Sequence, residues 1–363
     1  MEEKIFFIKN KEDAVHFNSI KQQVDEAINT ISSSRRTFAK VKAVSFPVIF
    51  LLLYVSAIFY IQNIGLFFLF YGLMGIATLL IFLNLIHEAV HGLVFKKQWK
   101  NKAMLYIFDL LGANSYIWKR RHNILHHGFQ NIAGWDSDIE QAGLFRIYPH
   151  EEKRKFHTHQ HRFVFIFYPL YLANWVLIRD FKDFFSSKQL IRKVSEIPRR
   201  EYFILFFFKL FYLFYIVIVP YLLGLSLIQS ILAMLFMLII AGTLALNFLL
   251  TPHVNVKNEF PLPDSNGRLP FSWLEHQFAT TNDVKNCNWF TRNLLGNFNF
   301  HIAHHLFPRI SSVYAPEITE IIKNYADQYN LGYRSYSMKN ALKYHFKLIK
   351  SNAIGMDVFE ENM

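Results

Sequence analysis

The chain has 363 residues and a formal net charge of +12, and 52% of its residues are hydrophobic. Its mean hydropathy of +0.16 is too high for an ordinary soluble protein and indicates a chain embedded in a membrane. The single cysteine, Cys287, excludes an intrachain disulfide and thiolate-ligated metal sites, so any metal must rest on nitrogen and oxygen ligands. The basic residues flank apolar runs, which excludes nucleic acid as the expected partner and favours anionic lipid headgroups.

Two apolar runs predict the membrane spans. They extend from Ala43 to Ile86 and from Leu210 to Leu250, and neither contains a charged residue or a histidine. One span needs about 20 apolar residues, so each run predicts two spans joined by a tight turn. The turns are expected near Gln62–Gly65 and Gly224–Ser226. The four predicted spans cover about residues 43–62, 65–86, 207–225 and 228–250.

Lysine and arginine are absent from both predicted turns and gather at the other ends of the spans. The bases concerned are Arg35, Arg36, Lys40, Lys42, Lys96, Lys97, Lys100, Lys102, Arg199, Arg200, Lys209 and Lys257. The positive-inside rule therefore places both turns outside and both termini in the cytosol. A short apolar segment, residues 163–178, contains Pro169 and predicts an interfacial or re-entrant helix rather than a fifth span.

Together these elements predict an all-α integral membrane fold. It consists of four transmembrane helices in two hairpins, interfacial helices, and a cytosolic helical cap that carries a metal site. We expect residues 1–42 to form a cytosolic N-terminal segment, residues 43–350 to form one membrane domain, and residues 351–363 to form a loose tail.

Nine histidines in four groups are the candidate metal ligands. They occur in the segments HEAVH, HNILHH and HIAHH and after the last predicted span: His87 and His91; His122, His126 and His127; His301, His304 and His305; and His253. Imidazole is the commonest protein ligand for iron, zinc and copper. The predicted topology puts all nine on the cytosolic side, and adjacent histidine pairs can serve different ions, which favours a dinuclear site. Glu88, Asp136 and Asp138 can accept hydrogen bonds from the ligands, or be ordinary solvated acids.

Seven other histidines are not predicted ligands. The tract with His150, His157, His159 and His161 is expected to be a solvated basic face near lipid headgroups or a bound nucleotide, and His16 and His345 are expected at the surface. His276 is expected to have a structural or second-sphere role.

The histidine segments and their flanks resemble the membrane fatty acid desaturase family, and in particular its acyl-CoA and front-end branch. The resemblance covers roughly residues 40 to 350. The matching residues are Trp118–His127, Asn131, Ile132, Gly134–Ile139, Pro252–Val254, Glu259–Asp264, Trp273, His276, Gln277, Thr280, Thr281 and Asn299–Pro308. Two positions depart from that branch: His301 stands where glutamine is usual, and Glu88 replaces the acid of an HDxxH segment. The position of oxidation on the substrate therefore stays open.

The resemblance implies an O2-dependent oxidoreductase with two iron ions, held by the nine histidines carried over by position. It would place a double bond in a fatty acyl chain, presented as acyl-CoA or in a lipid, with electrons from a separate ferredoxin or cytochrome b5-type protein. The haem-binding HPGG signature of a fused cytochrome is absent, which favours a bacterial inner membrane over the endoplasmic reticulum.

Two other functions remain as alternatives at this stage. A lipid or hydrocarbon hydroxylase would use the same site, because the outcome of iron–oxygen chemistry depends on how the substrate is placed. A metal transporter is disfavoured, because it would need ionisable residues within the spans.

Overall fold

The computed structural model describes residues 4–32, 34–139, 145–285 and 289–354. The predictions for Cys287 and for the tail beyond residue 354 concern residues outside these ranges. The chain forms two compact units. Unit 1 contains residues 1–35, 121–164 and 247–363, and unit 2 contains residues 36–120 and 165–246.

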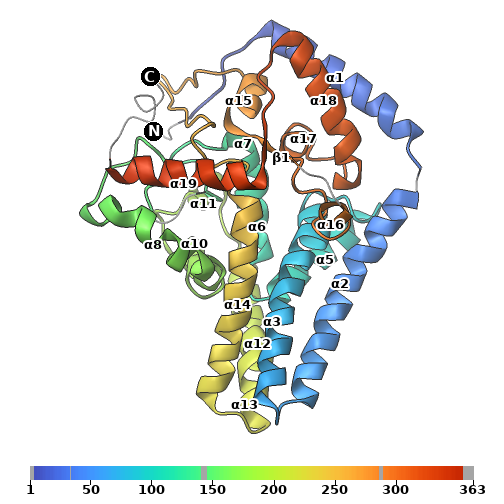
Figure 1. Ribbon diagram of the computed structural model, residues 1–363, viewed down its shortest axis with the longest axis vertical. Helices are drawn as coiled ribbons and strands as arrows, with labels where there is room; N and C mark the ends of the chain where they lie inside the picture. The colour runs from blue at the N-terminus through green and yellow to red at the C-terminus, as the bar shows by residue number, and fades with distance from the viewer. Residues whose placement is uncertain (1–3, 33, 140–144, 286–288, 355–363) are drawn as a thin grey trace. The chain divides into compact units, whose positions relative to one another are not determined.

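Unit 2 is built mainly from long apolar helices (Figure 1). Its first pair is α2 (Ser34–Phe59), which begins in unit 1, and α3 (Ile64–Ile81), which continues through a π-helical turn η1 (Phe82–Ile86) into α4 (His87–Val90). The second pair is α12 (Arg199–Leu213), continued by η6 (Phe214–Ile218) and α13 (Val219–Leu222), and α14 (Leu227–Leu249). Both turns fall where the sequence predicts them, and Figure 1 shows them at the same end of this unit.

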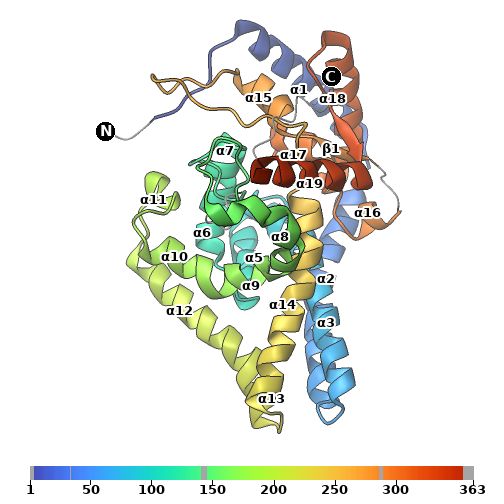
Figure 2. The ribbon, with the colours of Figure 1, turned by 60° about the vertical axis from the view of Figure 1, so that its left-hand side comes forward.

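Shorter helices complete unit 2. They are α5 (Gln98–Leu110), α6 (Ser115–Arg120), α9 (Tyr171–Asn174), the π-turn η5 (Trp175–Arg179), α10 (Asp180–Phe185) and α11 (Ile191–Val194). Figure 2 shows α10 beside the start of α12.

Small residues let the apolar helices of unit 2 approach closely. A Cβ atom added to Gly75 on α3 would lie 2.5 Å from the carbonyl oxygen of Met237 on α14. A Cβ atom on Gly242 of α14 would lie 2.6 Å from the carbonyl oxygen of Pro169. Because lipid is as apolar as the side chains, close backbone packing of this kind is a main source of helix association in membranes.

A buried ion pair connects three segments of unit 2. The Lys209 ammonium on α12 donates to the carbonyl oxygens of Gly112 and Val176, both at 2.5 Å, and to the Asp180 carboxylate at 2.7 Å. We call these four residues the Lys209 cluster. Lys209 is one of the bases at the ends of the predicted spans, and its side chain is only 8% exposed. An ammonium can be buried there because each of its three hydrogens meets an oxygen.

Within the described residues, five helices are long and apolar enough to cross a membrane. They span Ser34–Phe59, Ile64–Val90, Lys155–Phe185, Arg199–Leu222 and Leu227–Leu249. The protein is therefore a membrane protein, and four of these helices overlap the four predicted spans. The additional candidate, Lys155–Phe185, contains the segment with Pro169, which lies in a 3-10 turn, η4 (Tyr168–Leu170).

Unit 1 combines helices with a small sheet. Its elements are α1 (Lys11–Thr30), the π-turn η2 (Arg121–His126), α7 (His127–Phe129), η3 (Lys155–His159), α8 (Gln160–Phe167, which ends in unit 2), α15 (Trp273–Thr280), α16 (Trp289–Asn293), α17 (His301–Leu306), η7 (Ser312–Tyr314), α18 (Ala315–Tyr329) and α19 (Met338–Ile354). The strands β1 (Asp283–Lys285) and β2 (Ser335–Ser337) pair in parallel. The all-α prediction is thus corrected by one small sheet in the described residues.

The core of unit 1 forms where α1 and α18 pack together, as both ribbon views show (Figures 1 and 2). Ile20 and Val24 on α1 and Ile322 on α18 are fully buried in one apolar cluster, which also contains Ile302 and Leu306 from α17. The apolar side of the short helix α17 is thereby fixed in this core, which holds the histidines on the rest of α17 in place.

Candidate metal centre

The second histidine segment lies on a π-helical turn. Residues Arg121–His126 form η2. The rings of His122 and His126 still lie on one side, with centroids 5.5 Å apart and planes 21° apart. Another π-turn, η1, immediately precedes His87. Such turns are rare and are often found at functional sites.

Two aspartates orient the rings of this segment. Nδ1 of His126 lies 3.0 Å from Oδ1 of Asp136, and Nδ1 of His122 lies 3.1 Å from Oδ2 of Asp138. A carboxylate only accepts hydrogen bonds, so each Nδ1 carries the proton and each Nε2 offers a lone pair. This arrangement is typical of metal-binding histidines. Asp136 and Asp138 are therefore better described as acceptors of hydrogen bonds from the predicted ligands than as ordinary solvated acids.

The third histidine segment is the helix α17, as the spacing predicts. The N-terminus of α17 is held by Asp283 on β1, whose Oδ1 accepts the backbone N–H of Ile302 at 2.8 Å. The other oxygen of Asp283 accepts the hydroxyl of Tyr333 at 2.9 Å. Asp283 was not among the predicted site residues, because it is far along the chain from the helix end that it caps.

His253 lies just after α14 and is fully within unit 1. Its Nδ1 donates to the carbonyl oxygen of Thr280 at 3.3 Å. Its Nε2 lies 3.1 Å from Nε2 of His305. Two imidazole nitrogens facing each other at this distance are well placed to share a cation.

Four imidazoles form one candidate ligand set within unit 1. Each of them offers a nitrogen, and these four nitrogens all lie within 4.8 Å of one another: His126, His253, His301 and His305. All four side chains are buried. Burial lowers the pKa values of His253, His301 and His305 well below the usual range, which keeps these rings neutral. Neutral imidazole is the form that binds a metal.

His126 differs from the other three because of its acid. Burial lowers its pKa, but the Asp136 carboxylate outweighs this effect and the pKa is raised overall. For His122 burial dominates over Asp138, and the pKa is lowered. Arg121 shares Asp138 with His122, at 3.1 Å from the other carboxylate oxygen.

The remaining histidines of unit 1 lie beside this set. Nε2 of His127 is 3.2 Å from Nε2 of His122, and the ring of His127 contacts those of His304 and His305 at centroid distances of 4.6 and 4.7 Å. The rings of His122 and His304 are stacked at 6.0 Å. Seven of the nine predicted ligands therefore meet within unit 1.

His87 and His91 belong to unit 2, where they lie at the end of the helix that contains α3, η1 and α4. Their ring centroids are 5.2 Å apart, as the i, i+4 spacing predicts.

The residues of unit 1 fit a metal ion chemically. Several neutral imidazole nitrogens converge, and Nδ1 of His305 has no hydrogen-bond partner in the described residues. Buried polar atoms are almost always satisfied, so such an atom indicates a missing partner. A set made only of imidazoles suits iron, zinc or copper.

Other predicted histidine roles are corrected in part. His345 is buried, not at the surface, with Nδ1 2.6 Å from the carbonyl oxygen of Val254. His16 is half-buried and bonds to the hydroxyl of Tyr325. In the basic tract His157 is buried, whereas His150 and His159 are exposed as predicted. His276 bonds to the carbonyl oxygen of Gln130 at 3.0 Å, which matches a structural role.

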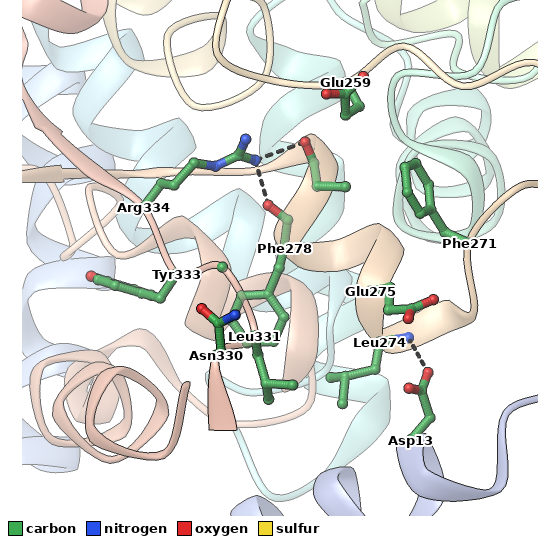
Figure 3. Close-up of a pocket in the computed structure, with 12 residues that line it drawn as sticks. Asp13, Glu259, Phe271, Leu274, Glu275, Phe278, Asn330, Leu331, Tyr333 and Arg334 are labelled. Carbon is green, nitrogen blue, oxygen red and sulfur yellow. Dashed lines mark hydrogen bonds between the residues drawn. The ribbon is translucent and has the colours of Figure 1, made fainter. Parts of the chain in front are cut away.

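Unit 1 also has a surface pocket of about 520 Å³, shown in Figure 3. None of its lining residues is a histidine, so the pocket is distinct from the histidines of unit 1. We call these the imidazole cluster: His122, His126, His127, His253, His301, His304 and His305. Arg334 spans one side and donates to the carbonyl oxygens of Phe278 and Ala279 near the end of α15 (Figure 3).

The imidazole pattern agrees with the family to which the sequence corresponds. The model of the fatty acid desaturase family matches residues 38–337, which is most of the chain. The chain therefore belongs to the fatty acid desaturase family, as its motifs predicted. It is an oxidoreductase of this class.

Individual relatives refine the class. Over 285 residues the chain is 29% identical to an sn-1 linoleoyl-lipid 6-desaturase of Arthrospira platensis, covering 77% of this chain and 76% of that protein. Over 300 residues it is 28% identical to an acyl-lipid (8-3)-desaturase of Physcomitrium patens, covering 80% and 61%. Over 269 residues it is 32% identical to an acyl-lipid (8-3)-desaturase of Mortierella alpina, covering 72% and 59%. The resemblance to front-end enzymes is confirmed, and desaturation is favoured over the alternative of hydroxylation.

Proposed function

We propose that this desaturase works through two iron ions held by the nine histidines predicted from the sequence. The observation that carries the proposal is the convergence of His126, His253, His301 and His305, buried and with their nitrogens within 4.8 Å of one another. The other five predicted ligands are His122, His127 and His304 of unit 1 and His87 and His91 of unit 2.

The bound iron would supply O2 activation. Overall, two hydrogens leave the acyl chain as a double bond forms. Two further electrons and two protons come from outside, and O2 is reduced to two molecules of water. The protein's own residues hold the ligands: Asp136 and Asp138 fix the tautomers of His126 and His122, so that each ring turns its Nε2 away from the carboxylate.

We further propose the membrane arrangement that the charges indicate. Four helices, Ser34–Phe59, Ile64–Val90, Arg199–Leu222 and Leu227–Leu249, would cross the bilayer, and the segment with Pro169 would lie at the interface. The termini and a helical cap with the metal centre would face the cytosol. The membrane would be the inner membrane of a bacterium.

The substrate would be a fatty acyl chain attached to a lipid. Support comes from the relatives, which are named as linoleoyl-lipid and acyl-lipid desaturases. Acyl-CoA is the other substrate form that the sequence allows. Electrons would come from a separate ferredoxin or cytochrome b5-type protein, and the net charge of +12 would favour docking of an acidic carrier.

The test is to express the protein with a matched electron donor and to profile cellular fatty acids by mass spectrometry. We expect a new double bond, and we expect His126→Ala to lower the product by at least about 100-fold, to the background, because it removes a ligand. His159→Ala is the matched control, since His159 is exposed and outside the cluster, and it should leave the product unchanged.

Two results would contradict the proposal. A hydroxylated product without an alkene would overturn desaturation, and an active purified protein without iron would overturn the iron centre. Position-specific analysis of the product then gives the site of the double bond, and lipid-class analysis separates lipid-linked from CoA-linked substrates.

A further inference from the structure

One buried asparagine, Asn131, hydrogen-bonds to the groups that accept from the ring nitrogens of two different candidate ligands. Asn131 is completely buried in unit 1, and it follows the second histidine segment by only a few residues. Its backbone is left-handed, with φ of 59°. Asparagine tolerates this conformation better than most residues.

The first contact leads to His126. The backbone N–H of Asn131 donates to Oδ2 of Asp136 at 3.0 Å. Asp136 is the carboxylate that holds Nδ1 of His126. The left-handed turn at Asn131 thus aims an N–H at the acid that fixes this ring.

The second set of contacts leads to His253. Nδ2 of Asn131 donates to the carbonyl oxygens of His253 and Glu259, both at 3.0 Å, and to that of Thr280 at 3.3 Å. The carbonyl of Thr280 is also the acceptor for Nδ1 of His253. A single amide therefore holds both the main chain of His253 and the group that orients its ring. The amide orientation is unambiguous, because carbonyl oxygens can only accept.

Thr280 is itself held from a second side. It is the last residue of α15, and Arg334 donates to the carbonyl oxygens of Phe278 and Ala279 just before it, as Figure 3 shows for Phe278. The end of α15 is thus fixed at several consecutive carbonyls. Asn131 connects this fixed end to Asp136, the acid that supports the second histidine segment.

We propose that Asn131 is a positioning residue that sets the geometry of the ligand set His126, His253, His301 and His305. It does so by holding the partners of His126 and His253 at the same time. The inference rests on the proposed metal centre. It predicts that loss of the side chain of Asn131 weakens one metal site selectively, whereas a general loss of structure would weaken both sites.

The test uses the purified full-length protein loaded with 57Fe, in two variants. Asn131→Asp keeps the shape but turns an acceptor toward three carbonyl oxygens. Asn131→Gly removes the side chain and keeps the left-handed backbone and its N–H. The measurements are iron content after challenge with a chelator, and the Mössbauer spectrum.

For Asn131→Asp we expect one of the two iron ions to be removed at a chelator concentration about 10- to 100-fold lower than in the wild type. The iron content after the challenge should then approach about half of the wild-type value. One spectral component should change more than the other. Asn131→Gly should shift the same component by a smaller amount.

The control is Asn352→Asp. Asn352 is also buried, and its Nδ2 donates to the carbonyl oxygens of Arg146 and Ile147 rather than to supports of a ligand. It should leave both components unchanged. Two results would overturn the inference alone. In the first, both Asn131 variants resist the chelator as the wild type does and keep its spectrum. In the second, Asn131→Asp and Asn352→Asp lose all their iron equally. A wild-type protein that purifies without iron would overturn the proposed iron centre and this inference together.

Discussion

The two units each contain a buried polar cluster. The clusters differ in how many of their polar atoms have hydrogen-bond partners within the cluster. In the Lys209 cluster of unit 2 the ammonium uses all three hydrogens on Gly112, Val176 and Asp180. In the imidazole cluster of unit 1 the rings of His122 and His126 are held from outside by Asp138 and Asp136. Their remaining nitrogens turn toward other imidazoles.

This difference distinguishes a structural cluster from a binding site. Burial of polar groups is common to both, so burial alone does not identify a site. The imidazole cluster brings several ring nitrogens together, whereas the Lys209 cluster matches one positive charge with acceptor oxygens. The first has capacity for a ligand, and the second is complete without one.

A loss of metal affinity is expected where the imidazole cluster depends on an acid. In Asp136→Asn an amide NH2 would replace one carboxylate oxygen and face an N–H donor in either orientation: Asn131 on one side, or Asp138 and Ile139 on the other. The charge that supports His126 would also be lost. We expect metal affinity to fall about 10- to 100-fold, measured by competition with a chelator.

Asp25→Asn is the control for this change, because Asp25 forms only an exposed ion pair with Lys21. If Asp136→Asn bound metal as tightly as Asp25→Asn, Asp136 would not support metal binding. The distinction between the two buried clusters would then fail.

A loss of stability is expected when the Lys209 cluster is broken. Lys209→Met leaves the buried Asp180 carboxylate without its cation. We expect a loss of about 3–5 kcal/mol in the free energy of unfolding, measured as a lower unfolding midpoint in detergent. Metal content of the surviving folded protein should stay at the wild-type value, because this cluster holds no ligand.

The double variant Lys209→Met with Asp180→Asn should recover part of that stability, since no unpaired charge remains. Lys21→Met is the exposed control and should cost less than about 0.5 kcal/mol. If Lys209→Met were as mild as Lys21→Met, the Lys209 cluster would not be the structural element inferred here.

A smaller, pH-dependent effect is expected at His345 beside the imidazole cluster. Burial lowers the pKa of His345 to about 4, from an ordinary value of 6.5. Above pH 6.5 the ring is neutral in both the folded and the unfolded chain. As the pH falls from 6.5 to 4, the unfolded chain binds a proton that the folded chain does not, so stability decreases.

His345→Asn keeps a donor for the carbonyl of Val254 and removes this titration. Its unfolding midpoint should decrease less than that of the wild type across the same pH window, by up to the equivalent of about 3 kcal/mol at pH 4. Parallel decreases in the two proteins would show that His345 does not contribute to acid sensitivity.

Local sequence pattern was sufficient where the relevant residues are neighbours in the chain. The apolar runs placed both hairpin turns, because a span needs a continuous apolar stretch. The spacing of His301, His304 and His305 correctly indicated a helix. The proximity of Asp136 and Asp138 to the second histidine segment suggested partners that the structure pairs with His126 and His122.

Pattern failed where the deciding partner is distant. Nothing near Lys209 in the chain shows that Asp180 and two carbonyl oxygens will enclose its ammonium. His345 was expected at the surface because its acceptor, Val254, is 91 positions away. The i, i+4 spacing of His122 and His126 does not by itself separate an α-helix from the π-turn that the structure shows at Arg121–His126.

The class of this protein follows from its sequence alone, which has apolar runs of span length and histidines at spacings that bind metal. Which histidines meet, and which groups orient them, depends on the tertiary structure. Asn131 contacts carbonyl groups more than 120 positions away, and Asp283 caps a helix that begins eighteen positions later. Such contacts depend on how the chain returns on itself, because hydrogen bonds act over about 3 Å and the pattern of the sequence records only neighbours along the chain.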